Sequence, residues 1–252
     1  MLDGYILESV LCKGNSIVYK AKSTTQKHDH SVVAIKENIG PSKGEIEQWR
    51  KLDHPNIIKI LDYIEEGDKS YIIMEYASEG ELFDRICRSK LTENEARNLF
   101  SQLLDAVDYC HKKGILHNDI KLENILLQDS KIKLADFEFS GKPYCGSIPY
   151  AAPEVFQRKP LYNFKSDIWS LGIVLYAMVA GFLPFDADGD DRMISKMLVK
   201  KLVWPEHFSK GNFVFDSFGL VDLVDRMLVL DPKKRISVEE IRSHQWMTAD
   251  YR

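Results

Sequence analysis

The chain has 252 residues, which is enough for one large domain or two small ones. Hydrophobic residues make up 44% of it and charged residues 29%, a balance that provides a core and excludes a disordered or fibrous chain. The 34 Lys and Arg residues against 38 Asp and Glu residues give a net charge of −4. This weak acidity argues against direct binding to nucleic acid or to an anionic membrane, which both favour a basic excess.

The four cysteines, Cys12, Cys87, Cys110 and Cys145, are scattered and form no CxxC pair. This usage indicates reduced thiols and therefore a cytoplasmic or nuclear location. The N-terminus has neither the basic stretch nor the apolar run of a signal peptide. Residues 168–185 approach the length of a membrane span, but serine, glycine and proline interrupt them. We expect this segment to be a helix buried in a large domain.

The first third of the chain has the apolar runs and turn residues of a β-sheet. Strands are predicted at Tyr5–Val10, Ile17–Lys22, Val32–Lys36, Ile57–Ile64 and Tyr71–Glu75. The sequence Glu66-Gly67-Asp68 predicts a turn before the last strand. A short helix is predicted at Glu45–Leu52, ending before His54-Pro55 because a residue that precedes proline disfavours the helical conformation.

After the last strand the hydrophobic period changes to that of helices. Thr92 and Glu95 form a capping-box signal for a long helix that Gly114 ends. Short strands are predicted at Ile125–Leu127 and Ile132–Leu134, and the remainder reads as helices separated by prolines. This order predicts an α+β fold with two lobes that meet near Tyr76–Ala77.

Two stretches further along the chain combine carboxylate, amide and ammonium groups. Residues 117–124 read HNDIKLEN, between a predicted helix and a predicted strand, and residues 135–138 read ADFE, after a strand. The side-chain oxygens of Asp119, Asn124 and Asp136 are hard ligands of the kind that hold Mg²⁺ on phosphates.

Upstream, Lys36 ends a predicted strand and Glu45 begins a short helix, so an ion pair between them is expected. Taken singly, these residues have ordinary structural explanations: Lys36 as a solvated strand end, for example, and Asp119 as the cap of a turn. Their order and spacing along the chain favour a function.

Six signatures in order resemble the eukaryotic protein kinase family. They are VAIK at 33–36, HNDIKLEN at 117–124, ADFE at 135–138, APE at 152–154, DIWSLG at 167–172 and Arg235, which in the family pairs with the APE glutamate. The resemblance runs from about Tyr5 to Met247. It implies a two-lobed kinase domain over 5–247, with an N-lobe of about residues 1–76, a C-lobe of about 77–252 and no additional domain.

The resemblance also implies ATP and Mg²⁺ as cofactors and protein molecules as substrates. Lys36, held by Glu45, would bind the α- and β-phosphates. Asn124 and Asp136 would bind Mg²⁺.

Three further residues are implied in the transfer itself. Asp119 would accept the proton of the substrate hydroxyl, and Lys121 would stabilise the γ-phosphoryl group in transfer. Ser147 matches a family Ser/Thr that hydrogen-bonds both of these residues and helps to bind the substrate.

The resemblance assigns the remaining ATP-binding residues by position. The phosphate loop comprises Leu11, Cys12, Lys13, Gly14, Asn15, Ser16, Ile17 and Val18. Val18 and Leu126 would enclose the adenine, Met74 would be the gatekeeper, and Glu75–Ala77 would be the hinge.

The sequence departs from the family pattern in the phosphate loop and at two motif positions. The loop keeps only Gly14 of three glycines, and Cys12 and Ser16 adopt positive φ at a higher cost than glycine does. Asn118 replaces the arginine of the HRD motif. Glu138 replaces the DFG glycine. Its carboxylate would add a metal ligand, repel phosphate or point to solvent, and we expect the last.

Two connections, residues 37–44 and 137–153, are also shorter than is usual in the family. Because Asn118 carries no charge to pair with a phosphate, we expect activity without phosphorylation of the segment 139–150. Abundance, location or an unidentified partner would then set the output.

Two functions of different class follow from these observations. One is an active kinase, and the other is a pseudokinase that acts as a scaffold through protein contacts. Pseudokinases usually lose the lysine, the catalytic Asp or the metal-binding Asp. The chain retains Lys36, Asp119, Asn124 and Asp136, which favours activity.

The lysine at position 121 resembles the pattern of the serine/threonine branch of the family. GELFDRI at 80–86 and CGS at 145–147 resemble the calcium/calmodulin-dependent, nutrient-sensing and checkpoint group. Within it, LYAMVAGFLPFD at 175–186 most resembles a DNA-damage checkpoint kinase with a cell-cycle role, and a nutrient-sensing kinase is the alternative. Glu81 and Glu123 match acidic positions that bind an arginine three residues before the phosphorylated residue, which predicts a basophilic enzyme.

Overall fold

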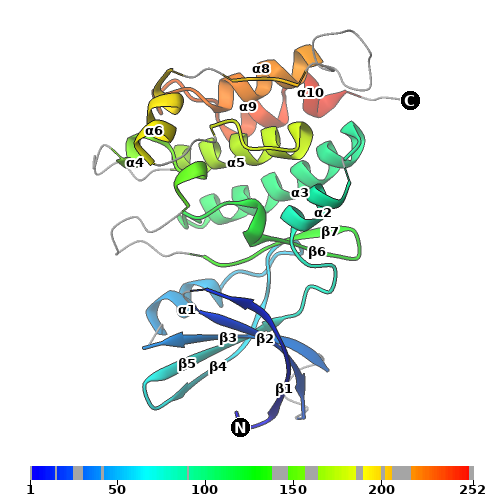
Figure 1. Ribbon diagram of the computed structural model, residues 1–252, viewed down its shortest axis with the longest axis vertical. Coiled ribbons are helices and arrows are strands. Elements are labelled where there is room, and N and C mark those ends of the chain that lie inside the picture. Colours follow the sequence, from blue (N-terminus) through cyan, green and yellow to red (C-terminus); the bar gives the residue numbers. More distant parts are fainter. Residues whose placement is uncertain are drawn as a thin grey trace.

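The computed structural model describes residues 2–14, 16–24, 31–40, 43–89, 91–137, 147–156, 164–185, 190–199, 202–205 and 217–249 of the chain. A β-rich N-lobe and a helical C-lobe are stacked along the long axis of the molecule (Figure 1). The predicted α+β fold with two lobes is confirmed.

The N-lobe consists of an antiparallel sheet with one helix beside it. Its strands are β1 (Tyr5–Lys13), β2 (Ile17–Ser23), β3 (Val32–Ile39), β4 (Ile60–Glu66) and β5 (Lys69–Glu75), in the spatial order β1-β2-β3-β5-β4. The helix α1 (Lys43–Trp49) follows β3. Gly67, in the predicted turn between β4 and β5, has a φ of 65°, which glycine adopts without the steric cost of a Cβ atom.

Strand β3 shows how the sequence orients the site. Val33 and Ile35 pack into a small cluster on one face of the sheet, and Ala34 belongs to the large core that continues into the C-lobe. Because successive side chains of a strand point to opposite faces, Lys36 lies on the same face as Ala34, toward the C-lobe.

Several predicted boundaries in the N-lobe were wrong. β1, β3 and β4 run further than predicted, to Lys13, Ile39 and Glu66, and β5 begins earlier, at Lys69. The strand predicted from Ile57 begins only at Ile60, because Ile57 and Ile58 pair instead with Leu134 of the other lobe: the Ile58 amide donates to the Leu134 carbonyl at 2.9 Å. The helix predicted to reach Leu52 ends at Trp49 and continues as a turn, in which the Leu52 amide donates to the Trp49 carbonyl at 2.9 Å.

The C-lobe is built from helices, with a small hairpin on the side that faces the N-lobe (Figure 1). The helices are α2 (Leu82–Arg88), α3 (Glu93–Lys112), α4 (Pro153–Phe156), α5 (Phe164–Ala180), α6 (Asp190–Val199), α8 (Ser217–Met227), α9 (Val238–Arg242) and α10 (Gln245–Thr248). The hairpin pairs β6 (Ile125–Gln128) with β7 (Lys131–Leu134), and the single 3₁₀ turns η1 (Leu122–Asn124) and η2 (Ile148–Tyr150) flank the site.

Local signals set the ends of α3 as predicted. The Thr92 hydroxyl accepts from the Glu95 amide at 3.2 Å, and the Glu95 carboxylate accepts from the Thr92 amide at 2.7 Å. After the helix, Gly114 has a φ of 74°. The capping box therefore fixes where the chain enters the C-lobe core.

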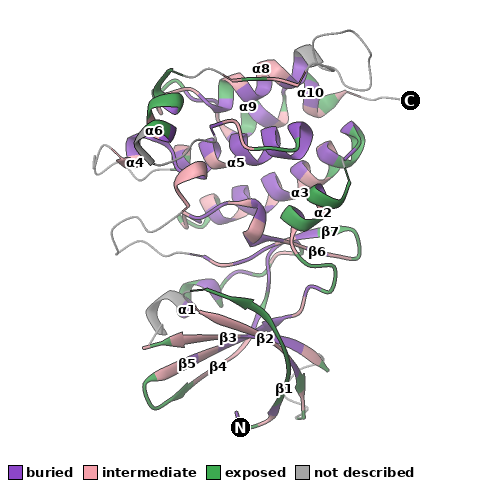
Figure 2. Cartoon of the chain, in the orientation of Figure 1, coloured by how far each residue is buried: buried purple, intermediate pink, exposed green. Residues whose placement is uncertain are grey.

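Helix α5 is buried on nearly all sides and lies at the centre of the C-lobe (Figure 2). Gly172 is required there, because a Cβ atom at this position would lie 2.9 Å from Leu228 Cδ2 and 3.0 Å from Met227 Cβ. The prediction of a buried helix is confirmed, but the helix ends at Ala180 and not at Phe185. Among the described residues, no helix is both long enough and apolar enough to span a membrane.

The predicted pair of Glu154 and Arg235 ties α4 to the loop before α9. Two hydrogen bonds, at 2.7 and 3.0 Å, join the guanidinium to the carboxylate. The Glu154 side chain is 5% exposed and the Arg235 side chain 0%. Arg235 also donates to the Val229 carbonyl at 3.0 Å. The side chains are thus fully bonded inside the core.

Candidate active site

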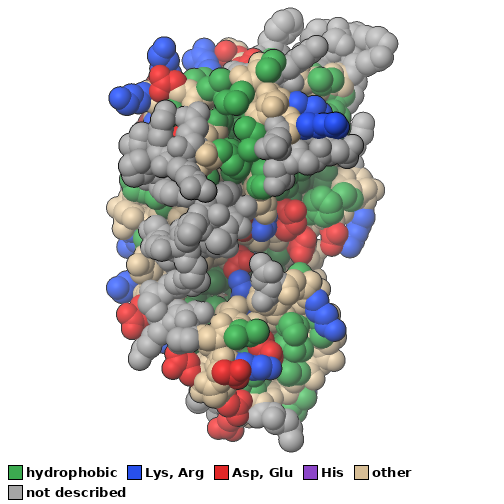
Figure 3. All heavy atoms as spheres, turned by 60° about the vertical axis from the view of Figure 1, so that its left-hand side comes forward, with side chains coloured by type: hydrophobic (Ala, Val, Ile, Leu, Met, Phe, Trp, Pro, Cys, Tyr) green, Lys and Arg blue, Asp and Glu red, His purple; other side chains and the backbone are tan. Residues whose placement is uncertain are grey.

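The candidate site lies where the loop before β6 faces the N-lobe sheet. On the face drawn in Figure 3, charged side chains of both signs lie in the hollow between the lobes. The groups that meet there come from β3, from residues 117–124, from the end of β7 and from the start of η2.

Asp119 is the centre of a hydrogen-bonded network. The Asn124 amide nitrogen donates to the Asp119 carboxylate and to its backbone carbonyl, both at 2.8 Å. The Lys121 ammonium lies 2.7 Å from the same carboxylate. The Ser147 amide donates to Asp119 at 3.2 Å, and Lys121 donates to the Ser147 hydroxyl at 3.1 Å. The structure thus brings together four of the residues that the sequence singled out.

Lys121 carries its positive charge in this network. Burial by itself would lower the pKa of Lys121, but the bond to Asp119 and the nearby charges of Glu123 and Asp136 raise that pKa above its ordinary value. The ammonium group is therefore available to an incoming anion at neutral pH.

A buried carboxylate holds the backbone of this loop in place. Asp167, at the start of α5, accepts from the amides of His117 and Asn118, both at 3.1 Å, and bonds His111 Nε2 at 2.8 Å. Asn118 has a φ of 65°, a conformation that asparagine tolerates better than most residues. The sequence identified Asp167 only as part of a helix-start motif, and nothing in the spacing pointed to His111.

Lys36 reaches across the interlobe space to Asp136. Its ammonium group forms an ion pair with the Asp136 carboxylate. Burial would raise the pKa of Asp136, but the charge and hydrogen bond of Lys36 lower it below its ordinary value. The backbone of the expected partner, Glu45, lies in α1, but its side chain is outside the described part of the structure.

Phe137 anchors the segment that carries Asp136. Its ring lies 4.5 Å from that of His117 and 5.3 Å from that of Trp49 in α1, measured between centroids. The Trp49 indole nitrogen donates to the Ile58 carbonyl at 2.9 Å. The position of Asp136 is thus coupled to both lobes. Its neighbour Glu138 lies outside the described residues, as does the segment 138–146.

The apolar residues expected around adenine share one core cluster. Val18 and Leu126, from opposite lobes, pack against the cluster that contains Met74 and Ala77. In the β2–β3 register Val18 pairs with Lys36, so the apolar contact and the ammonium group are neighbours.

The phosphate loop is a tight connection between β1 and β2. Cys12 pairs with Val18 and Lys13 with Ile17, and the Gly14 amide donates to the Ser16 carbonyl at 3.0 Å. Leu11 is half exposed at the end of β1, and Asn15 lies outside the described residues. The expected cost of replacing glycines was wrong for Cys12 and Ser16, since neither has a positive φ. Cys12 is a strand residue here, and extended backbone suits any side chain.

Glu81 and Glu123 lie on the C-lobe side of the site. Glu81 forms a β-bridge with Leu126. Its pKa is raised, chiefly by burial and further by the charges of Asp84 and Glu123, against the opposing charge of Lys121. One carboxylate oxygen of Glu123 is buried without a hydrogen-bond partner. Two carboxyl groups therefore lie near each other, and the described cations and hydrogen-bond donors only partly offset their charge and polarity.

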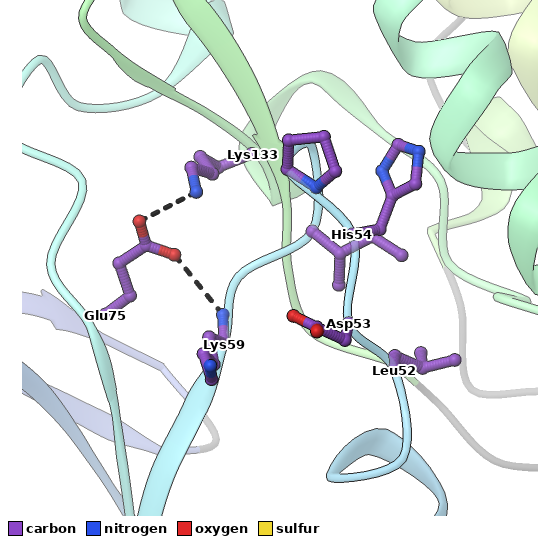
Figure 4. Close-up of a pocket in the computed structure, with 8 residues that line it drawn as sticks. Leu52, Asp53, His54, Lys59, Glu75 and Lys133 are labelled. Carbon is purple, nitrogen blue, oxygen red and sulfur yellow. Dashed lines mark hydrogen bonds and ion pairs between the residues drawn. The ribbon is translucent and has the colours of Figure 1, made fainter.

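The side chain of Glu75 points away from this site. In the β3–β5 register Glu75 pairs with Val33, on the face of the sheet opposite to Lys36. Its carboxylate pairs with Lys133 of β7 at 2.7 Å and lines a cavity (Figure 4). Any contribution of Glu75 to adenine binding is thus left to its backbone. Lys133 was not singled out in the sequence, because a lysine in a short strand reads as an ordinary exposed residue.

Comparison with known protein families identifies the family of this chain. The family model described as protein kinase domain matches residues 7–247. The chain therefore belongs to the protein kinase family, a family of enzymes, and its fold is that of a protein kinase domain.

Particular relatives define the branch more closely. The chain is similar to serine/threonine-protein kinase SIK1 of Rattus norvegicus, at 41% identity over 98% of this chain and 33% of the relative. It is similar to SIK2 of Gallus gallus at 41% identity, over 98% of the chain and 32% of the relative. The NUAK family SNF1-like kinase 1 of Homo sapiens matches at 38% identity, over 98% and 39%. The chain spans about a third of the length of these relatives.

These matches correct the expected subgroup. They name SIK and NUAK kinases, and they do not support the prediction of a DNA-damage checkpoint kinase with a cell-cycle role. The nutrient-sensing alternative agrees better with an SNF1-like relative. The checkpoint prediction rested on a few short motifs, whereas the comparison covers 98% of the chain.

Proposed function

We propose that this chain is an active protein kinase that transfers the γ-phosphoryl group of ATP to serine or threonine of protein substrates. The observation that carries the proposal is the convergence of the Asp119 network with the Lys36–Asp136 pair across the lobes. A scaffold has no need to keep these charged groups aligned.

The donor set fits magnesium shared with phosphates. Asn124 uses its amide nitrogen on Asp119, which leaves its amide oxygen as the potential ligand, and Asp136 offers a carboxylate. Among the described residues no three His, Cys, Asp or Glu side chains gather as a metal site, and the ligands proposed here are Asn124 and Asp136. Mg²⁺ typically keeps its remaining positions for water and substrate phosphates. When bound, the ion would neutralise charge on those phosphates.

The protein groups then have separate tasks. Lys36 binds phosphate oxygens, and its present contact with Asp136 keeps the ammonium group beside the metal ligand. Asp119 orients the substrate hydroxyl and accepts its proton. Lys121 stays protonated and offsets the charge on the transferred group.

A peptide-library phosphorylation assay tests the proposal. We expect magnesium-dependent incorporation of phosphate into Ser/Thr peptides by the purified chain, and a loss of about 100-fold or more in the Asp119→Asn variant. Asp119→Asn is nearly isosteric, so its circular dichroism and Tm check that the fold is intact. Nucleotide binding without any turnover in the unmodified chain would support the pseudokinase alternative instead.

We propose that the substrates carry a basic residue before the acceptor. The acidic positions Glu81 and Glu123, with Asp84 beside them, lack full compensation among the described groups. An arginine side chain from the substrate would supply the missing charge and a forked donor for a carboxylate.

Glu81→Gln is expected to reduce the preference for arginine at the third position before the acceptor by about tenfold, because a charge-assisted hydrogen bond is replaced by a neutral one. Phosphorylation of an arginine-free peptide should change little, which separates substrate selection from catalysis. Glu79→Gln, an exposed neighbour bonded to the Ser130 amide, is the matched control. A proline-directed or acidic preference in the library would contradict the role of Glu81.

We further propose a nutrient-sensing function of the SIK and NUAK type, inside the cell in the cytoplasm or nucleus, with a kinase domain over residues 5–247. The level of identity to those kinases and the family match over 7–247 support it. Their names do not define the substrates of this chain. A regulatory partner remains part of the proposal because Asn118 offers no charge to an activating phosphate.

A further inference from the structure

In the described part of the chain, two of the connections between the N-lobe and the C-lobe lie near the hinge. One is the chain itself at Tyr76–Ala77. The other is the loop of residues 50–59 between α1 and β4, which belongs to the N-lobe in sequence but bonds to β7 of the C-lobe. The Ile58 amide donates to the Leu134 carbonyl at 2.9 Å, and the Leu134 amide donates to the Asn56 carbonyl at 2.8 Å.

Glu75 connects these two junctions. Its amide donates to the Lys59 carbonyl at 3.0 Å, and its carboxylate accepts from the Lys59 amide at 3.4 Å. The other carboxylate oxygen pairs with the Lys133 ammonium at 2.7 Å. Figure 4 shows Glu75 between Lys59 and Lys133, so that the last residue of β5, the 50–59 loop and β7 meet at one carboxylate.

We propose that Lys133, through the Glu75 side chain, is a positioning residue for the nucleotide. The ion pair fixes the end of β5 against the C-lobe, and the backbone of the hinge that follows is thereby held in the position that receives adenine. This inference rests on the proposed function, since it concerns how ATP is bound. Lys133 acts at a distance, because its ammonium group is engaged by Glu75, which lies on the face of the sheet opposite to Lys36.

Burial makes this pair stronger than a surface ion pair. The side chains of Glu75 and Lys133 are 10% and 15% exposed, so salt screens their attraction less than it screens exposed charges. Removal of one partner leaves a buried charge without compensation, which is the costly change at such a pair. The Glu75 carboxylate would then turn toward water, and the end of β5 would lose its fixed position.

An adjoining cavity makes that rearrangement feasible without unfolding. A cavity of about 170 Å³ opens beside the pair, and its walls include Leu52, Ile57 and the stem of Lys59 (Figure 4). Water can therefore reach a carboxylate that has lost its lysine. The cavity is also large enough to admit a small alkylammonium ion next to Glu75.

Lys133→Met is the primary test, in steady-state kinetics and in equilibrium binding of ADP. We expect KM for ATP and Kd for ADP to rise about fivefold together, with kcat within about twofold of the unmodified chain. Lys133→Arg should restore KM to within about twofold, because it keeps a positive charge that can reach the Glu75 carboxylate. Lys69→Met is the matched control. The Lys69 ammonium lies 2.6 Å from the Glu37 carboxylate, so the substitution removes the partner of a glutamate in the same sheet. This pair does not join the two lobes, so KM should not change.

Two further measurements separate positioning from a general structural effect. In a double-mutant cycle, Glu75→Gln together with Lys133→Met should raise KM no more than Lys133→Met does alone. Ethylammonium added to Lys133→Ala should lower KM for ATP toward the unmodified value, and it should have no effect when Glu75 is also changed to Gln.

The outcomes are distinguishable. An unchanged KM in Lys133→Met, a kcat that changes while KM does not, or an equal rise of KM in Lys69→Met would each overturn the inference. Absence of turnover in the unmodified chain would count against the proposed function, whereas ADP binding still tests the positioning role independently of turnover.

Discussion

Replacement of Lys36 by methionine is expected to lower turnover by about 100-fold or more, because it removes a fixed positive charge from the place where phosphate charge accumulates. Methionine retains the length and most of the volume of the lysine stem, so packing between β2 and β3 is preserved. The measurement is kcat for peptide phosphorylation at saturating ATP and magnesium.

The same substitution should leave the fold nearly intact, with a Tm within a few degrees of the unmodified chain. Asp136, the ion-pair partner of Lys36, is only half-buried, so water can solvate its carboxylate. Without Lys36, the pKa of Asp136 rises, because the charge and the hydrogen bond that lower it are gone. Lys22→Met, at an exposed position of β2, controls for the loss of a lysine. Retention of more than about a tenth of the turnover would contradict the assignment of Lys36.

Arg235→Met is expected to destabilise the chain by about 3–5 kcal/mol, because it leaves the Glu154 carboxylate buried without its partner. The substitution also removes the donor to the Val229 carbonyl. Urea-induced unfolding measures the loss, and a corresponding decrease in Tm of about 10 °C is expected for a chain of this length.

A surface ion pair provides the comparison for Arg235. Arg242 pairs with Asp105 at 2.5 Å and with Asp108 at 3.1 Å, but its side chain is 39% exposed. Arg242→Met should therefore cost no more than about 1 kcal/mol. If Arg235→Met costs as little as Arg242→Met, the buried pair with Glu154 does not stabilise the C-lobe as proposed.

Local sequence patterns were sufficient for the features that depend on neighbours in the chain. Thr92 and Glu95 predict the start of α3, since a capping box needs only two side chains three residues apart. The uniformly apolar segment that became α5 predicts burial on all sides. The order of Lys36, Asp119, Asn124 and Asp136 predicts the site, because family signatures record residue type and spacing.

Long-range pairing was not available from these patterns. Ile57 is a β-branched residue of the kind that favours strands. It nevertheless lies outside β4, because the neighbouring backbone bonds to Leu134 in the other lobe. The cost expected for Cys12 in the phosphate loop assumed a positive φ, and the β1–β2 register made it a strand residue instead. In both cases the hydrogen-bond partner, which the local sequence does not specify, decided the conformation.

The sequence by itself determined which chemical groups this protein brings to its site, and the tertiary structure decided which of them touch. Asp167 holds the backbone at His117 and Asn118 from about fifty positions away in the chain. Glu75, expected at the hinge, directs its carboxylate to Lys133 of β7. The physical reason is that composition and periodicity report local preference and burial, whereas a buried charge is compensated by whichever partner the packing of distant segments brings within bonding distance.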